Sequence, residues 1–190
     1  MNKIIDGKTY SHSKGSIYLI DCNVWMFIYY TFGNYIPKKV KNYSDLVSDI
    51  VKDKSKIIFP DILVSEFCNT YLKSEWKRYN TLTGITSDYK RDFRKLQEYK
   101  DAVEEIKDIL KVEISSLNNI QFMDSKIDIP DFNSFFDNST EFDFNDKYYA
   151  ELAKKEGAII ITDDADFGVF DGINVITFNQ RLLNIANGIA

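Results

Sequence analysis

The stretch that decides the fold is FDFNDKYYAELAKKEGAIIITDDADF, residues 142–167. Its first half predicts a helix, because Phe144, Tyr148 and Leu152 form an apolar stripe at four-residue steps. Its second half contains four apolar residues, 158–161, rich in β-branched types, which is typical of a strand buried on both faces of a parallel sheet. A helix followed by such a strand indicates an α/β fold.

The ends of this predicted helix carry suitable capping residues. Asp143 or Asn145 can cap the amino end, and Asp146 falls in the first turn, where a negative charge meets the positive end of the helix dipole. Gly157 suits the left-handed conformation that ends many helices. The helix is therefore expected to stop just before the strand.

Polar residues follow the predicted strand directly, namely Thr162, Asp163, Asp164 and Asp166. Three acids within four residues repel one another unless they stay solvated, take up protons or share a cation. Mg²⁺ and Mn²⁺ prefer carboxylate oxygens, so a metal site explains the group economically. The alternative is a solvated acidic loop after an edge strand.

A second predicted strand, residues 17–20, ends in the same way. Asp21 follows it immediately, and Asn23 comes two residues later. Asp21 alone could be a cap for a helix over 24–30. Because ligands collect at the carboxyl ends of strands in open α/β sheets, two strands that end in acids favour a binding site.

Further elements alternate along the chain. Glu66 lies in the second turn of a helix that Pro60 and Asp61 open, among apolar and small neighbours, so it either leans to the surface or serves a site. The remaining predictions are a helix from Ser44, a strand at 56–59, a less regular stretch at 75–86, a long helix at 88–111, a short helix and strand within 114–122, an acidic loop at 126–140, a strand at 174–178 and a helix at 180–186. This alternation predicts a parallel sheet covered by helices on both faces.

The chain of 190 residues is long enough for one domain, and its formal charge is −5. The charge is uneven, because residues 73–100 carry eight basic against four acidic side chains, whereas 124–171 carry thirteen acids against four lysines. The basic side chains of 73–100 could contact the phosphates of a nucleic acid. The alternative is that they lie on a solvated helix face of mixed charge. The candidate phosphate contacts are Lys73, Lys77, Arg78, Lys90, Arg91, Arg94 and Lys95.

Other residue types exclude several kinds of chemistry. Cys22 and Cys68 have no paired metal spacing and are expected to be reduced and buried. His12 is the lone histidine, so a mechanism must work without histidine as general base, which favours metal-activated water.

The sequence shows no signal peptide, and its longest apolar run (17–32) is too short to span a bilayer. A cytoplasmic protein without membrane contact is therefore expected.

Three segments resemble the signature segments of PIN-domain ribonucleases, a family that includes the VapC-type toxins. They are IYLIDCNVW, PDILVSEF and FNDKYYAELAKKEGAIIITDDADF. The resemblance implies a PIN-like three-layer α/β/α fold with a central parallel sheet of four to five strands. It also implies a single domain over 1–190 with a helical insertion at about 75–140, between the helix that holds Glu66 and the third acid.

The same resemblance implies the site. The catalytic acids would be Asp21, Glu66, Asp146 and Asp164, which hold one or two Mg²⁺ or Mn²⁺ ions. Asp166 is an alternative metal ligand, Asn23 and Thr162 would hold water or support the acids, and Asp163 fills the variable slot beside them. The implied activity is metal-dependent endoribonuclease cleavage of RNA, with an antitoxin partner if the chain is a toxin, and with a homodimer as a further option.

Two other functions stay open at this point. Asp164 and Asp166 form an Asp-x-Asp motif after an apolar strand, as in phosphatases that form an aspartyl-phosphate, although those place the motif on the first strand. A PIN-like module could also bind RNA or protein without cutting. Hydrolysis of a small phosphoester without RNA cleavage would indicate the phosphatase, and binding without hydrolysis would indicate the module.

Overall fold

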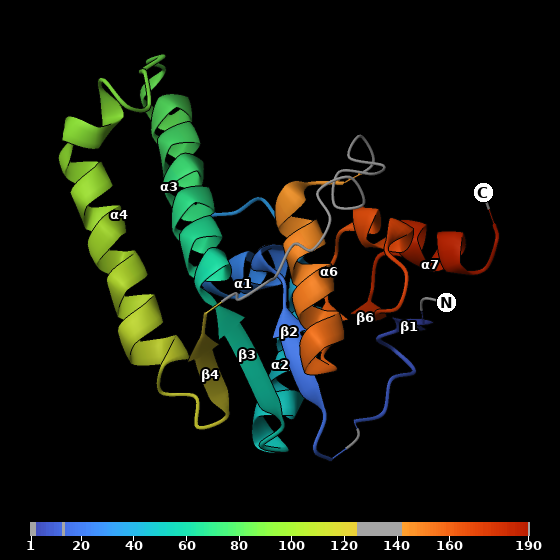
Figure 1. The fold of residues 1–190 in the computed structure, drawn as a ribbon. Helices are drawn as coiled ribbons and strands as arrows, with labels where there is room; N and C mark the ends of the chain where they lie inside the picture. Colours follow the sequence, from blue (N-terminus) through green and yellow to red (C-terminus); the bar gives the residue numbers. More distant parts are fainter. Residues whose placement is uncertain (1–2, 13, 125–141, 190) are drawn as a thin grey trace.

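The computed structural model describes residues 3–12, 14–124 and 142–189 (Figure 1). The acidic loop predicted at 126–140 lies outside these residues. A single parallel sheet organises the chain, with strand order β1-β6-β5-β2-β3-β4. The strands are β1 (Lys3–Asp6), β2 (Ile17–Ile20), β3 (Lys56–Pro60), β4 (Ile120–Met123), β5 (Ile159–Ile161) and β6 (Asn174–Thr177).

The α/β class is confirmed, but the sheet has six strands where four to five were expected. The unexpected strand is β1, whose sequence KIID carries no long apolar run. It is an edge strand that forms by pairing with β6, with Ile4 opposite Val175. Its partner lies about 170 positions further along the chain, so the local sequence gives no signal for it.

Helices cover both faces of the sheet, which gives three layers. Figure 1 shows α6 in front of the sheet and α2 behind it, while α3 and α4 form a hairpin beyond the β3–β4 edge. The central strand residues Leu19, Ile58 and Ile160 are fully buried and form the middle of the core. The helices are α1 (Cys22–Tyr29), α2 (Pro37–Lys52), α3 (Asp61–Thr83), α4 (Gln97–Asp108), α6 (Phe144–Glu156) and α7 (Gln180–Ala186).

Two helix boundaries differ from the predicted ones. α2 begins at Pro37, seven residues before Ser44, because proline suits the first helical position, where no backbone N–H is needed. α3 runs through the stretch predicted as less regular and ends at Thr83, where Gly84 adopts φ 70°. The helix is therefore longer than expected.

The prediction of a single long helix at 88–111 is wrong. The chain there forms a 3₁₀ turn, η1 (Phe93–Lys95), then α4, then a π-helical segment, η2 (Ile109–Ile114). Asp88 Oδ1 accepts a hydrogen bond from Arg91 N at 2.6 Å, and Asp92 Oδ2 accepts one from Asp88 N at 2.9 Å. Such local side-chain bonds to the backbone compete with helical hydrogen bonds, and Leu96 is extended before α4 begins.

Residues 75–140 contribute more than helices to the fold. β4 lies within this range and pairs in parallel with β3, with Phe59 opposite Phe122. The segment therefore supplies an edge strand of the central sheet as well as α4. Across the described residues, no helix is both long and apolar enough to cross a membrane.

The buried face of α6 is rotated relative to the predicted stripe. Phe144 is 41% exposed, whereas Asp146, Tyr149 and Ala150 are buried together with Leu152. The predicted ends are confirmed, since Asp143 caps the helix by accepting a hydrogen bond from Asn145 N and Gly157 ends it with φ 64°. The rotation directs one acid and one tyrosine into the interior, toward the sheet.

Candidate metal centre

The carboxyl edge of the sheet has a crevice position between β2 and β5. These two strands are neighbours, and the chain continues from β2 to β3 on one side but from β5 to β6 on the other, so the connections after them run in opposite directions along the sheet. In open α/β sheets, ligands bind outside the carboxyl ends of strands at such a switch point. Asp21 follows β2 and Thr162 follows β5, which places the predicted site residues there.

Three acids converge at this edge. Asp146 from the first turn of α6 and Asp164 and Asp166 from the loop after β5 each offer a carboxylate oxygen, and these oxygens all lie within 4.8 Å of one another. Asp146 is buried, and the other two are half-buried. A set of carboxylate oxygens from two elements matches what a hard divalent cation requires.

Asp21 is 3% exposed and held in a fixed orientation. Its Oδ2 accepts hydrogen bonds from Thr162 Oγ1 and from Asn23 Nδ2, each at 2.6 Å. It occupies the N-cap position of α1, but its side chain makes no capping hydrogen bond, so helix capping does not account for this carboxylate. Burial raises the pKa of Asp21 to about 7, the Thr162 hydroxyl opposes this rise, and the charges of Glu66 and Asp164 add to it.

Asp146 shows how closely the acids are coupled. Burial is the main cause that raises its pKa to about 9, and the charges of Asp21, Asp164, Glu66 and Asp143 raise it further. The four acids that were predicted to act together therefore share one electrostatic environment. A bound cation would reverse this effect, because it favours the ionised carboxylates.

Glu66 turns toward the site and not toward the surface. The hydroxyl of buried Tyr149 donates a hydrogen bond to Glu66 Oε2. Burial raises the pKa of Glu66, and the Tyr149 hydrogen bond opposes that rise. Because Tyr149 comes from α6, this bond ties the helix of Glu66 to the helix of Asp146.

Thr162 joins the two strand ends. Its hydroxyl donates to Asp21 and accepts a hydrogen bond from Asp164 N at 2.9 Å. Asp164 Oδ1 in turn accepts from Asp166 N at 2.9 Å, and burial followed by the charge of Asp164 raises the pKa of Asp166. One fully buried hydroxyl thus fixes the acids of both strands relative to each other.

Asp163 lies outside the acid cluster. Its carboxylate accepts hydrogen bonds from Lys39 Nζ at 2.6 Å and from Tyr43 Oη at 3.0 Å. The Tyr43 hydroxyl also lies 2.8 Å from the Thr162 carbonyl oxygen, and it accepts a hydrogen bond from Phe178 N at 3.0 Å. These contacts anchor the loop from the α2 side.

Sequence reasoning did not identify Lys39, Tyr43 and Tyr149 as supports of the site. Lys39 and Asp163 are 124 positions apart, and a lysine on a helix gives no sign of such a partner. Tyr149 follows Tyr148, which was assigned to the apolar stripe of the same helix. The available signal was that a buried tyrosine hydroxyl usually needs a hydrogen-bond partner, and in the structure that partner is Glu66.

The basic residues are not joined to the acid cluster by any contact among the described residues. Arg78 pairs with Glu75 at 2.6 Å and lies over the ring of Phe32, and Arg91 pairs with Asp92. Arg94 lies over the ring of Tyr89. Figure 1 places residues 84–96 at the tip of the α3–α4 hairpin, away from the sheet. The exposed lysines of the set are Lys73, Lys77, Lys90 and Lys95.

Two solved structures are similar to this fold. VapBC2 from Rickettsia felis, bound to a DNA fragment from their promoter, is 14% identical with a TM-score of 0.47, over 85% of this chain and 98% of that chain. PAE2754 from Pyrobaculum aerophilum is 15% identical with a TM-score of 0.44, over 94% of each chain.

No protein-family profile matches the chain, and no curated protein matches it. At 14% and 15% identity and TM-scores below 0.5, the two structural likenesses say nothing about the activity of this chain. The chemistry of the acid cluster must therefore be derived from the residues of this chain.

Proposed function

We propose that this chain is a metal-dependent endoribonuclease that hydrolyses RNA phosphodiester bonds. The observation that supports it most strongly is the convergence of Asp146, Asp164 and Asp166 within 4.8 Å, beside buried Asp21, at the switch point of the sheet. This grouping supports the catalytic and metal-ligand roles proposed for Asp21, Glu66, Asp146 and Asp164, with Asp166 as a further ligand.

The donor set fits Mg²⁺ or Mn²⁺. All candidate ligands are carboxylates, which suit these ions better than soft metals. Within the described ranges, no ion pair joins Asp21, Asp146, Asp164 or Asp166 to a lysine or arginine. Asp21 and Asp146 are buried acids with raised pKa values and no paired basic side chain among these residues, and a bound cation would stabilise their ionised forms.

The protein residues would have distinct tasks in the reaction. A Mg²⁺ or Mn²⁺ ion held there supplies Lewis acidity and makes water more acidic near neutral pH. Asp146, Asp164 and Asp166 would hold the ion, and Thr162 and Asn23 hold the Asp21 carboxylate in a fixed orientation. Asp21 and Asp146 must lose their protons before they can act as ligands, because only the ionised carboxylate binds well.

Histidine takes no part in this proposal. His12 contacts the ring of Tyr10 and comes before the amino end of β2, whereas the acids follow the carboxyl ends of strands. Proton transfer at the site would therefore fall to carboxylates and water. Glu66, whose pKa is raised by burial and whose carboxylate accepts a hydrogen bond from Tyr149, is a candidate for this proton transfer.

The substrate and partner follow from the family resemblance and stay predictions. RNA is the proposed substrate, and the basic residues from Lys73 to Lys95 are the proposed backbone contacts. An antitoxin would be the protein partner if the chain is a toxin, and a homodimer is a further prediction. A single domain with its insertion at 75–140 is proposed for the whole chain.

Cleavage of a mixed RNA pool by the purified protein tests the proposal, with Mg²⁺, Mn²⁺ or EDTA in parallel. We expect cutting with either metal and none in EDTA or in Asp164→Asn. A small phosphoester in the same buffers tests the phosphatase alternative, and its hydrolysis without RNA cleavage would replace the proposal. RNA binding without cutting under any of these conditions would instead indicate the non-catalytic module.

A further inference from the structure

A pocket of about 610 Å³ adjoins the acid cluster and shares Asp166 with it. It lies between the start of α6, the 3₁₀ turn η3 (Ala165–Val169) and α7. A volume of this size is within the range of small-molecule and nucleotide sites. The side chains that matter to the inference are Phe142, Asp143, Asp166, Val169, Arg181 and Ile185.

Arg181 is the basic side chain of this pocket. Its backbone N–H is held by the Asn179 side chain at 2.9 Å, which fixes the start of α7. It lines the same pocket as Asp166, so the guanidinium borders the same space as the acid cluster. Among the described residues, no ion pair engages it, which leaves its planar fork available for a phosphate.

Apolar side chains line the rest of the pocket. Val169 and Ile185 are 41% and 48% exposed, which is high for large apolar side chains beside a charged site. Phe142 is held in place by Phe170, with ring centroids 5.0 Å apart. Bases and ribose rings pack well on such surfaces, because every base offers an apolar face to stack or lean on.

We propose that this pocket holds the nucleotide next to the scissile phosphate, with Arg181 on its phosphate and the apolar side chains against its base and ribose. The inference rests on the proposed RNA hydrolysis and adds a residue that orients the strand. Asp166 belongs to both the pocket and the acid cluster, so a nucleotide held there presents the adjacent phosphate to the proposed metal ligands.

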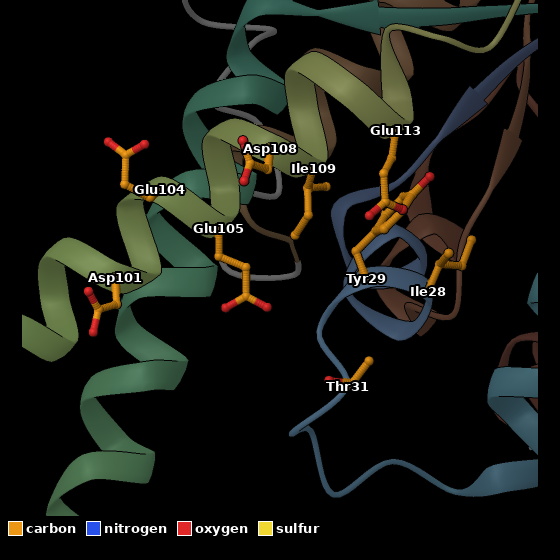
Figure 2. A pocket seen from close by; sticks show the side chains of 9 residues that line it. All are labelled: Ile28, Tyr29, Thr31, Asp101, Glu104, Glu105, Asp108, Ile109 and Glu113. Carbon is orange, nitrogen blue, oxygen red and sulfur yellow. The ribbon is translucent and has the colours of Figure 1, made fainter.

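Charge excludes the pocket between α1 and α4 from this role. Figure 2 shows carboxylates along α4 and η2, beside Tyr29 and Ile28 of α1. Such a surface repels phosphate. The acids that line it are Asp101, Glu104, Glu105, Asp108 and Glu113.

Binding of fluorescein-labelled single-stranded RNA in EDTA tests the Arg181 contact without cleavage. We expect Arg181→Ala to weaken binding about tenfold, the usual cost of a lost charged hydrogen bond. The slope of log affinity against log salt should shrink by about 0.7, the value for one phosphate on a single strand. Lys14→Ala is the control of equal charge, because exposed Lys14 precedes the amino end of β2, away from the pocket.

Val169→Trp tests the apolar part of the same pocket. The larger ring occupies the space of the base, so RNA affinity should fall while the salt slope stays that of the wild type. Thermal unfolding of both variants checks that they fold, and Val169 and Arg181 are both exposed enough for substitution. Arg181→Lys should retain part of the affinity and the whole salt slope.

The results separate this inference from the proposed hydrolysis. If Arg181→Ala binds RNA with the affinity and salt slope of the wild type, the pocket assignment is wrong, whether or not the protein cuts RNA. If RNA binding depends on Arg181 and Val169 but no metal supports cleavage, the proposal that the protein hydrolyses RNA is wrong, and the pocket remains a nucleotide-binding site.

Discussion

Lys39 Nζ lies 2.6 Å from Asp163 Oδ2, across 124 positions of sequence. This ion pair divides the acids of one short loop between two tasks. Asp163 anchors the loop to α2, while Asp164 and Asp166 face Asp146 in the acid cluster. Of these neighbouring aspartates, Asp163 supports the proposed metal centre, and Asp164 and Asp166 form part of it.

Lys39→Met should destabilise the protein by about 1–2 kcal/mol. The Lys39 side chain is 32% exposed and that of Asp163 is 11% exposed, so the cost lies between that of a surface pair and that of a buried pair. Urea unfolding measures it. Lys41→Met breaks the exposed pair with Asp45 and should cost less than about 0.5 kcal/mol. Equal effects of the two substitutions would contradict the anchoring role.

Thr162→Val should weaken metal binding at pH 7. The substitution keeps the shape but removes the hydroxyl that lowers the pKa of Asp21, so this pKa should rise above about 7. More protons must then be displaced for the metal to bind, and the loss should shrink as pH increases. Mn²⁺ titrations at pH 7 and pH 8.5 measure this. Thr162→Ser retains the hydroxyl and should behave like the wild type.

Asp146→Asn should stabilise the metal-free protein at pH 8. Because the folded-state pKa of Asp146 is about 9, against an ordinary value near 3.8, the folded state holds a proton that the unfolded state has lost between these values. The unfolding free energy of the wild type therefore decreases as pH rises through this window, by up to about 1.4 kcal/mol per pH unit from this group.

Urea unfolding in EDTA at pH 6 and pH 8 measures this effect. The variant should show a smaller decrease between the two pH values than the wild type, since asparagine does not ionise. Asp45→Asn is the matched control on the exposed face of α2 and should retain the wild-type pH dependence. An unchanged pH dependence in Asp146→Asn would mean that Asp146 is not buried as described.

Added Mg²⁺ or Mn²⁺ should raise the melting temperature of the wild type. An ion that binds the folded state alone stabilises it in proportion to the logarithm of its concentration, by about 2.7 kcal/mol at a hundred times its dissociation constant. The increase should be larger at pH 8 than at pH 6, because Asp21 and Asp146 lose their protons more easily there. Asp164→Asn should respond less at either pH.

The sequence was sufficient to predict the elements that surround the site. β2, β5 and α6 carry strong local signals, namely apolar β-branched runs, a capping aspartate and a closing glycine. The edge strand β1 and the turn around Leu96 were not predicted. β1 depends on its partner β6, and the turn depends on side-chain bonds from Asp88 and Asp92 to the backbone.

The convergence of Asp146, Asp164 and Asp166 could be expected from the sequence, because each lies just after a strand or in the first turn of a helix, where topology brings such residues together. Their supports could not be expected, because hydrogen bonds such as Tyr149 to Glu66 join residues 83 positions apart on different helices. The orientation of Asp163 also needed the structure. Three acids within four residues look alike in sequence, and only the contact with Lys39 distinguishes Asp163 from the other two.

The most direct test of the proposed metal centre is the rate of RNA cleavage at saturating Mn²⁺, measured for wild type, Asp146→Asn and Asp45→Asn. We predict metal-dependent cleavage in the wild type and in Asp45→Asn, and a loss of at least about a hundredfold in Asp146→Asn, as is typical when a group that stabilises transition-state charge is removed. Cleavage by Asp146→Asn at the wild-type rate would contradict the assignment of these acids as the catalytic centre.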